Sequence, residues 1–330
     1  MPHQTRKNKI AGLTMPLLAV CLNAVEQRWQ ELPALPEPNG GFACGVLPDA
    51  IIVAGGTNWT DGKKQWLKSV RKLDLESLRW SDLGPLDQPL SYALVGVSRA
   101  ELLLVGGTSG AAAFHGKVSI GGGRVAYAFA GGFTIPSVLA AGGQIADELL
   151  CVGGTDDLVN AAGYRRDAFS WNLKTGTQRT LPPYPGPAFG LAAAAVTGTE
   201  LFLFGGVTWD ATNQTVVNLS EAYAFSPLRN SWRRLESFPF SVRGVSAVAL
   251  DDRLLYIAGG YKNKEEEFTD QAFIYDVEND QYRTAPALPY RAMVGLVRSG
   301  EYVYCLGGED KQKHRSAAAY RIKVADLLRP

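Results

Sequence analysis

The feature that most constrains this chain is a short apolar run ending in two glycines, which occurs six times. The glycine doublets begin at Gly55, Gly106, Gly153, Gly205, Gly259 and Gly307. Their spacings are 51, 47, 52, 54 and 48 residues. A nearly constant spacing is typical of one structural unit repeated along a chain. The 330 residues are therefore predicted to form one repetitive domain.

Each period also contains further segments with the composition of β-strands. A second apolar strand follows the doublet, as in residues 168–172. An aromatic residue then opens a third strand, as at Trp80, Trp232 and Tyr282. Small apolar residues, such as those at 190–196, form the segment before the next doublet. Four strands in about 50 residues are typical of a kelch-type blade, so the fold predicted is an all-β, six-bladed kelch β-propeller.

The sixth period lacks its outer strand after residues 316–322, and a matching segment occurs at the start of the chain. Residues 28–33 have the same form as residues 232–235, with a Trp followed by a Leu. We expect this N-terminal strand to complete the last blade, because closing the ring removes exposed strand edges.

The second period is the least regular. Between Thr108 and Pro136 no Trp opens an outer strand, and extra glycine clusters occur at 121–123 and 131–132. These clusters lie about half a period from their neighbours, so we interpret them as turns and a degenerate outer strand. A seventh blade is not predicted.

The first residues have the layout of a secretory signal. A basic start at residues 6–9 precedes an uncharged segment, 10–22, and Ala24 offers a cleavage position. We therefore expect residues 1–24 to be a signal peptide and 25–330 to be one propeller domain, periplasmic or otherwise exported. A disordered tail is the alternative. No later segment reaches the uncharged length of about 18 residues that spans a bilayer.

Charge and composition exclude several kinds of partner. The chain has 33 basic and 32 acidic side chains, so its net charge of +1 gives no field for attracting nucleic acid or anionic membrane. Its histidines are His3, His115 and His314, too few and too scattered for a multi-histidine metal centre. The sequence has no phosphate-binding glycine loop either. We predict no metal and no cofactor.

In a four-stranded blade, the loop after strand two and the loop into the next blade lie on one face. Polar residues of these loops should meet around one mouth of the central channel. The candidates for substrate binding there are Asn58, Lys64, Trp66, Arg243 and Arg291. Tryptophans in such loops either stack on a sugar ring or pack the loop itself. Loop lysines and arginines are often simply solvated.

Two regions of the chain resemble a known family. Residues 40–43, 54–56 and 62–66 are similar to the corresponding blade of bacterial N-acetylneuraminate (sialic acid) mutarotases of the kelch class. Gly307-Gly308-Glu309, with Arg315 six residues after the glutamate, resembles the loop that carries that family's proposed catalytic Glu and Arg. Here the Glu/Arg blade comes last and the other comes first, as in the cyclically permuted branch of the family.

This resemblance implies a mutarotase or epimerase that interconverts the α and β anomers of N-acetylneuraminate by acid/base-assisted ring opening and closure. Glu309 would take and return the proton of the anomeric hydroxyl, and Arg315 would hold the sugar carboxylate. The implied partner is a small-molecule sugar acid, with no cofactor; a weak homo-oligomer is compatible with it.

Two alternatives remain open on the sequence. Glu309 and Arg315 form either a catalytic pair or a surface salt bridge within their loop, which would contribute little. The whole propeller is either an enzyme or a non-catalytic kelch module that binds a glycan or protein partner, because this fold hosts both.

Overall fold

The computed structural model describes residue 1 and residues 29–122, 124–128 and 138–329. The predicted signal peptide therefore lies outside the described residues from position 2 onward, as does the glycine doublet at 131–132.

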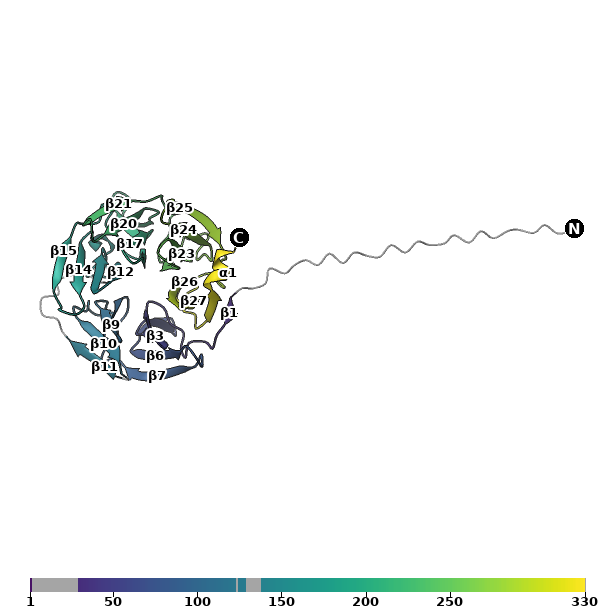
Figure 1. The fold of residues 1–330 in the computed structure, drawn as a ribbon, viewed down its shortest axis with the longest axis horizontal. Helices are drawn as coiled ribbons and strands as arrows, with labels where there is room; N and C mark the ends of the chain where they lie inside the picture. The colour runs from purple at the N-terminus through teal and green to yellow at the C-terminus, as the bar shows by residue number, and fades with distance from the viewer. Residues whose placement is uncertain (2–28, 123, 129–137, 330) are drawn as a thin grey trace.

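Six four-stranded antiparallel sheets are arranged in a ring around a central axis (Figure 1). Blade I is β2 (Ala43–Leu47), β3 (Ala50–Ala54), β6 (Ser69–Asp74) and β7 (Trp80–Pro85). Blade II is β8 (Leu94–Ser98), β9 (Glu101–Val105), β10 (Lys117–Gly121) and β11 (Arg124–Ala128). Blade III is β12 (Ala141–Ile145), β13 (Glu148–Val152), β14 (Ala168–Asn172) and β15 (Gln178–Leu181).

The remaining three blades follow the same order from the axis outward. Blade IV is β16 (Ala193–Val196), β17 (Leu201–Phe204), β20 (Ala222–Ser226) and β21 (Ser231–Arg234). Blade V is β22 (Ser246–Ala249), β23 (Leu254–Ala258), β24 (Ala272–Asp276) and β25 (Gln281–Ala285). Blade VI is β26 (Met293–Ser299), β27 (Tyr302–Glu309), β28 (Ala319–Lys323) and β1 (Gln30–Glu31). The predicted all-β, six-bladed propeller is confirmed.

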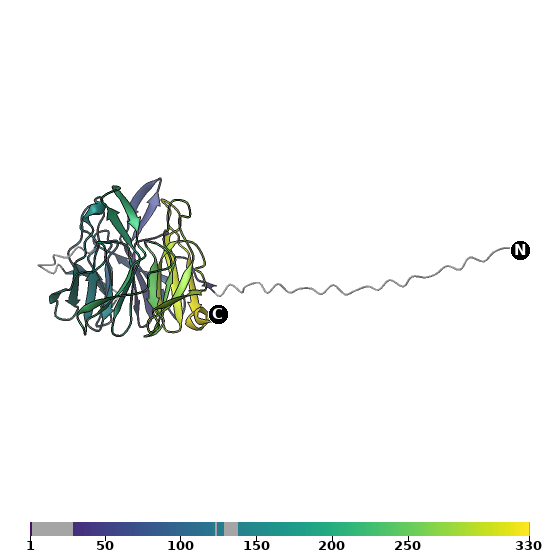
Figure 2. The same ribbon diagram turned by 90° about the horizontal axis from the view of Figure 1, so that it is seen from above.

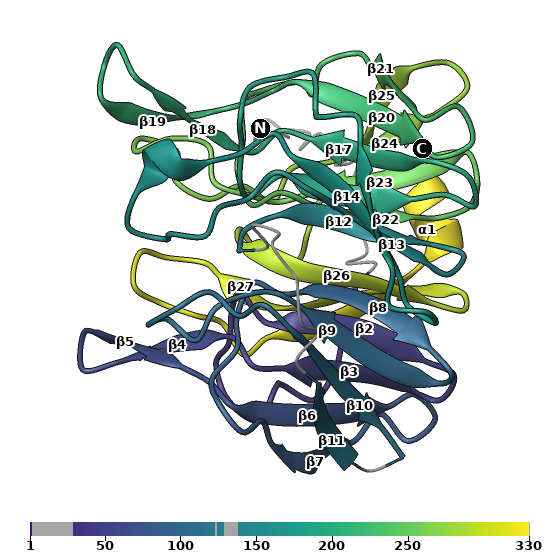
Figure 3. The ribbon, with the colours of Figure 1, turned by 90° about the vertical axis from the view of Figure 1, so that its left-hand side faces the viewer.

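Two additional hairpins and two short helical segments decorate the ring. The hairpins are β4 (Thr57–Thr60) with β5 (Lys63–Trp66), and β18 (Val207–Asp210) with β19 (Thr215–Asn218). Both project from the same face of the disc, as the side views show (Figures 2 and 3). The helical segments are η1 (Ala161–Gly163) and α1 (Val324–Leu328). Among the described residues, no helix is both long enough and apolar enough to cross a membrane.

The second strand of each blade is buried on both sides because it faces neighbouring blades. Every residue of β3 and of β17 is buried, which fits their unbroken apolar sequences. The glycine doublets directly follow these strands in five blades and lie within β27 in blade VI, and all twelve glycines have left-handed backbone. Gly308 has φ +104°, and a Cβ there would lie 2.1 Å from the carbonyl oxygen of Met293. The doublets are therefore geometric requirements of the blade.

Blade II has the degenerate form that its sequence indicates. β10 ends at Gly121, and β11 follows as the outer strand, without an opening Trp. The glycines at 121 and 122 thus belong to a turn within this blade, in agreement with the prediction.

The N-terminal strand closes the ring as predicted. β1 pairs antiparallel with β28, Gln30 opposite Arg321 and Glu31 opposite Tyr320. Beyond β1, the amide of Leu32 donates a hydrogen bond to the carbonyl oxygen of Ala319 at 2.9 Å. Figure 1 shows β1 at the rim of the ring, near α1 at the other end of the chain. Blade VI is therefore built from both ends of the sequence.

In four blades, an aromatic residue at the start of the outer strand fastens the blade to the one before it. Trp80 Nε1 donates to the carbonyl oxygen of Pro33 at 2.8 Å. The corresponding bonds run from Trp232 to Pro182 (2.8 Å), from the Tyr282 hydroxyl to Glu236 (3.0 Å) and from Trp29 to Ala287 (2.7 Å). Four of the six junctions between blades therefore have the same aromatic bond, including the one made by the N-terminal segment.

We predict that removing residues 1–35 destabilises blade VI before the other blades, because β28 then becomes an unpaired edge and the Trp29 bond to blade V is lost. The truncated protein should melt at a lower temperature, and amides of β28 should exchange with deuterium faster than those of β20. Removing only residues 1–24 is the matched control and should change neither. Unchanged exchange in β28 after the longer truncation would contradict this role of the N-terminal strand.

Candidate functional site

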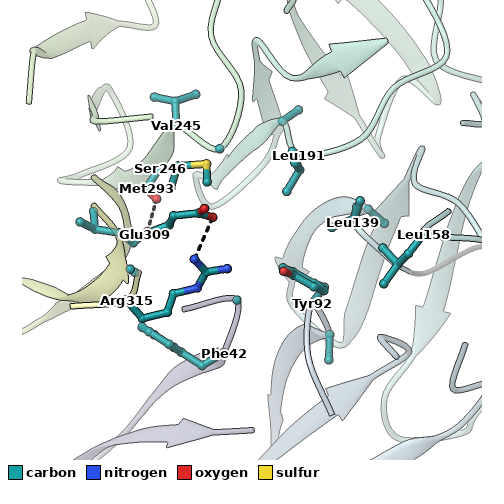
Figure 4. A pocket seen from close by; sticks show the side chains of 18 of the residues that line it. Phe42, Tyr92, Leu139, Leu158, Leu191, Val245, Ser246, Met293, Glu309 and Arg315 are labelled. Carbon is teal, nitrogen blue, oxygen red and sulfur yellow. Dashed lines mark hydrogen bonds and ion pairs between the residues drawn. The ribbon is translucent and has the colours of Figure 1, made fainter. Parts of the chain in front are cut away.

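A cavity of about 420 Å³ opens at one mouth of the central channel (Figure 4). This volume is within the range of small-molecule sites. Its wall is apolar on one side, where Leu139, Leu158 and Leu191 lie, and polar on the other, where Glu309 and Arg315 lie. The polar wall comes from blade VI. The cavity can therefore surround a ligand that has both apolar surface and an anionic or hydroxyl group.

Corresponding positions in the six blades form a ring around this cavity. The residues are Gly41, Tyr92, Leu139, Leu191, Gly244 and Met293, and all line the cavity. Every one except Met293 has a positive φ, between 53° and 68°. Five of them lie two residues before an innermost strand, where the left-handed turn directs them to the mouth, and Met293 is the first residue of β26. Tyr92 is the member of this ring with a polar side-chain group.

Glu309 is the last residue of β27 and follows the sixth glycine doublet directly. The corresponding residues of the other blades are Thr57, Thr108, Thr155, Val207 and Tyr261. The carboxylate therefore occupies a position that is uncharged in the other five blades. Its Oε2 lies 3.1 Å from Nη1 of Arg315, and the two side chains are 24% and 5% exposed respectively.

The Arg315 guanidinium is held by both blade VI and blade I. Its Nη1 donates to the carbonyl oxygen of His314 at 2.9 Å, and its Nε donates to Thr57 Oγ1 at 3.4 Å. Gly40 leaves the space for this side chain, because a Cβ on Gly40 would lie 2.5 Å from Arg315 Cδ. Among the described residues none accepts a hydrogen bond from Nη2, which points into the cavity in Figure 4.

A buried tyrosine supports this loop from below. The hydroxyl of Tyr290 donates a hydrogen bond to the carbonyl oxygen of Gly307 at 2.6 Å. Burial raises the pKa of Tyr290 well above its ordinary value, so the phenol stays neutral and remains a donor at physiological pH. The bond fixes the doublet that precedes Glu309.

Lys64 and Trp66 reach the site from the β4–β5 hairpin. Lys64 lines the cavity, and its Nζ donates a hydrogen bond to the Tyr92 hydroxyl at 3.1 Å. The same ammonium lies 4.4 Å from the centroid of the Trp66 ring. Trp66 is not among the residues that line the cavity; it packs beside Lys64 and over Gly110. In this arrangement Trp66 contacts its own hairpin and the loop of blade II.

Arg243 borders a neighbouring cavity of about 580 Å³ that shares Leu191, Met293 and Glu309 with the first. Its guanidinium lies 4.2 Å from the Tyr261 ring centroid, and its Nη1 donates to Asn218 Oδ1 at 3.0 Å. Arg243 and Glu309 thus line the same second cavity, and Lys64 is not among its lining residues.

Two predicted binding residues lie away from the cavity. Arg291 has a 70% exposed side chain, 3.8 Å from Asp270 Oδ1, because it precedes the turn that carries Met293 to the mouth. Asn58 is half-buried in β4, and its Oδ1 is buried without a partner among the described residues. Neither is among the residues that line the cavity.

Tyr92 is a polar cavity residue that the sequence reasoning did not identify. It lies in the irregular second repeat and outside the loops that follow the doublets. The sequence signal that could have identified Tyr92 is its distance from the next glycine doublet. Tyr92 precedes Gly106 by 14 residues, as Gly41 precedes Gly55 and Leu139 precedes Gly153.

The remaining candidate groups show no arrangement typical of a metal centre. His314 Nδ1 lies 2.5 Å from Asp310 Oδ1, and this pair is on the exposed part of the loop. In the part of the chain that the structure describes, no group of three or more His, Cys, Asp or Glu side chains gathers in one place.

Comparisons with known proteins find two kinds of relative by sequence. A mouse protein named Kelch-like protein 35 is 29% identical over 175 residues, covering 52% of this chain and 27% of that protein. An N-acetylneuraminate epimerase of Salmonella enteritidis PT4 (strain P125109) is 23% identical over 171 residues, covering 42% of this chain and 44% of that protein. The chain thus spans less than half the length of either relative in these matches.

The fold and the repeats have independent support. A solved structure titled "Structure of YjhT" has a TM-score of 0.73 and 14% identity, covering 89% of this chain and 97% of that one. The Kelch motif matches residues 38–86, 188–239 and 244–289, which fall in blades I, IV and V. The protein is therefore a kelch-repeat β-propeller.

Proposed function

We propose that this protein accelerates interconversion of the α and β anomers of a sugar acid, with N-acetylneuraminate as the expected substrate. The observation that carries the proposal is the Glu309–Arg315 pair in the wall of a cavity at the channel mouth. The similarity to N-acetylneuraminate epimerases supports it, and gives the reason for choosing this sugar.

The reaction requires little more than controlled proton transfer. N-acetylneuraminate is a cyclic hemiketal, and its anomers exchange when the ring opens to a ketone and closes on the opposite face. A proton must leave the anomeric hydroxyl, and one must reach the ring oxygen. The Glu309 carboxylate is partly exposed to the cavity and can accept the first proton and return it on closure. A positioned general base contributes about 10²- to 10⁴-fold.

Arg315 supplies the complementary charge. Its Nη1 is paired with Glu309, so a substrate carboxylate is expected to meet the guanidinium first through Nη2. A two-point grip on the substrate requires the Glu309–Arg315 ion pair to open. Substrate binding would then release the Glu309 carboxylate for chemistry, because its cationic partner is engaged by the sugar acid.

A non-catalytic role is the second candidate. The similarity to mouse Kelch-like protein 35 favours it, since that match has the higher identity of the two and covers more of this chain. In this case the same cavity would bind a glycan or a segment of a protein partner without changing it. The two candidates differ in one measurable respect, the rate of anomer exchange at saturating protein.

We predict that Glu309→Gln abolishes accelerated anomer exchange, lowering the enzymatic rate by about 10²-fold or more, because the amide cannot accept the anomeric proton. The exchange can be followed by NMR of α- and β-N-acetylneuraminate. Glu301→Gln, an exposed glutamate of the same blade, is the control. Full rate in the Glu309 variant would exclude it as the base, and no acceleration by the unaltered protein would favour the binding module.

We predict that Arg315→Lys keeps the charge but weakens sugar-acid binding by about tenfold, equivalent to losing one good charge-assisted hydrogen bond. Lysine presents a single ammonium and cannot bond Glu309, Thr57 and a ligand with fixed geometry. Affinity can be measured by calorimetry with N-acetylneuraminate. The control is Arg298→Lys, whose side chain is exposed on blade VI. Equal affinity for the Arg315 variant and the unaltered protein would remove Arg315 from the binding site.

A further inference from the structure

We propose that Tyr92 is the second proton-transfer group of this site, donating a proton to the ring oxygen, and that Lys64 positions it. This inference rests on the proposed function. It concerns protonation of the ring oxygen, a step in which Glu309 has no assigned role. One carboxylate can serve the anomeric hydroxyl, while the ring oxygen needs its own donor in the same step.

The geometry places a phenol across the cavity from the carboxylate. Tyr92 lines the cavity, and Figure 4 shows its hydroxyl directed toward Glu309 and Arg315 from the facing side. Because Lys64 Nζ donates to this hydroxyl at 3.1 Å, the phenol oxygen acts as acceptor in that bond. None of the described residues accepts the hydrogen of the phenol itself. That hydrogen is therefore available to a ligand between the two walls.

The position of Tyr92 in its blade argues against a packing role alone. Corresponding residues at the channel mouth are glycine, leucine or methionine. Tyr92 has φ +59°, as Leu139 and Leu191 have at the corresponding positions, so the turn of the blade sets the direction of its side chain. Its ring is further confined by Gly41, since a Cβ on Gly41 would lie 2.5 Å from Tyr92 Cε1. The fold thus holds one phenol in a fixed orientation at the cavity.

Lys64 has the contacts of a residue that supports Tyr92. Its ammonium is half-buried between two rings, 4.4 Å from the Trp66 centroid and 5.3 Å from the Tyr92 centroid. An ammonium within hydrogen-bond distance attracts negative charge as it develops on an oxygen in a transition state. Lys64 therefore stabilises the negative charge that develops on Tyr92 when the proton leaves. Cation–π contact with Trp66 keeps the ammonium in place.

The proton transfers balance over a full cycle. During opening, the anomeric hydroxyl gives its proton to Glu309, the bond between the anomeric carbon and the ring oxygen breaks, and the ring oxygen takes the proton of Tyr92. The product is the open-chain ketone, with Glu309 protonated and Tyr92 as phenolate beside Lys64. After the carbonyl group turns over, the same steps run in reverse. The hydroxyl re-forms the ring bond, Tyr92 regains its proton, and Glu309 returns its proton to the anomeric oxygen.

The test is a double-mutant cycle on kcat and KM for anomer exchange, using Tyr92→Phe, Lys64→Met and the double variant. Tyr92→Phe keeps the ring and should lower kcat by about a hundredfold with KM changed less than about twofold, because only proton donation is lost. Lys64→Met should lower kcat by about tenfold. The double variant should be no slower than Tyr92→Phe alone, since Lys64 acts through the phenol.

Matched controls separate chemistry from folding. Tyr302→Phe, in blade VI, and Lys63→Met, an exposed neighbour in β5, should leave kcat and the melting temperature unchanged. If Tyr92→Phe keeps full kcat while the unaltered protein is active, the inference about Tyr92 fails and the proposed function stands. If the two single effects multiply in the double variant, Lys64 does not act through Tyr92. A protein without any acceleration overturns both proposals.

Discussion

The pairing of β1 with β28 is the constraint on which the rest of the structure depends. A ring of blades has no free edge only when its last blade is complete, and here the missing strand comes from the other end of the chain. The blade completed in this way carries both Glu309 and Arg315. Hydrogen bonds from aromatic residues also hold neighbouring blades together. Trp29 makes the one that joins blades V and VI. The strand pairing that closes the ring therefore also completes the blade that carries the site.

The Arg315 guanidinium contributes both to the contact between blades VI and I and to the cavity wall. A buried cation requires charged and polar partners, and this one finds them in its own loop and in the first strand segment of the β4–β5 hairpin of blade I. The contact crosses the seam where the sequence begins and ends. Gly40 makes it possible by leaving out a side chain. The ion pair first considered as either catalytic or structural is therefore part of a junction between blades as well as part of a cavity wall.

The sequence allowed the ring, its closure and part of the site to be predicted, for physical reasons that can be traced residue by residue. Glycine doublets are required by φ values that other residues rarely adopt, so they mark the strand ends clearly in the sequence. Glu309 could be recognised because its position is uncharged in the other repeats. The outward direction of the Arg291 side chain could not be predicted, because residue type and spacing do not fix which way an exposed loop side chain points. Tyr92 was missed for a related reason: the left-handed position that turns it inward is occupied by leucine or glycine elsewhere.

The six corresponding residues around the cavity affect how the ligand preference of such a protein can change. These residues belong to no strand in five of the blades, and they line one cavity although they are separated by about fifty residues in sequence. A change at one of them alters the shape and polarity of the chamber while leaving the sheets untouched. At these positions ligand preference can therefore change with little effect on the strands. One such scaffold can be retuned for new small molecules by exchanging a single residue per blade.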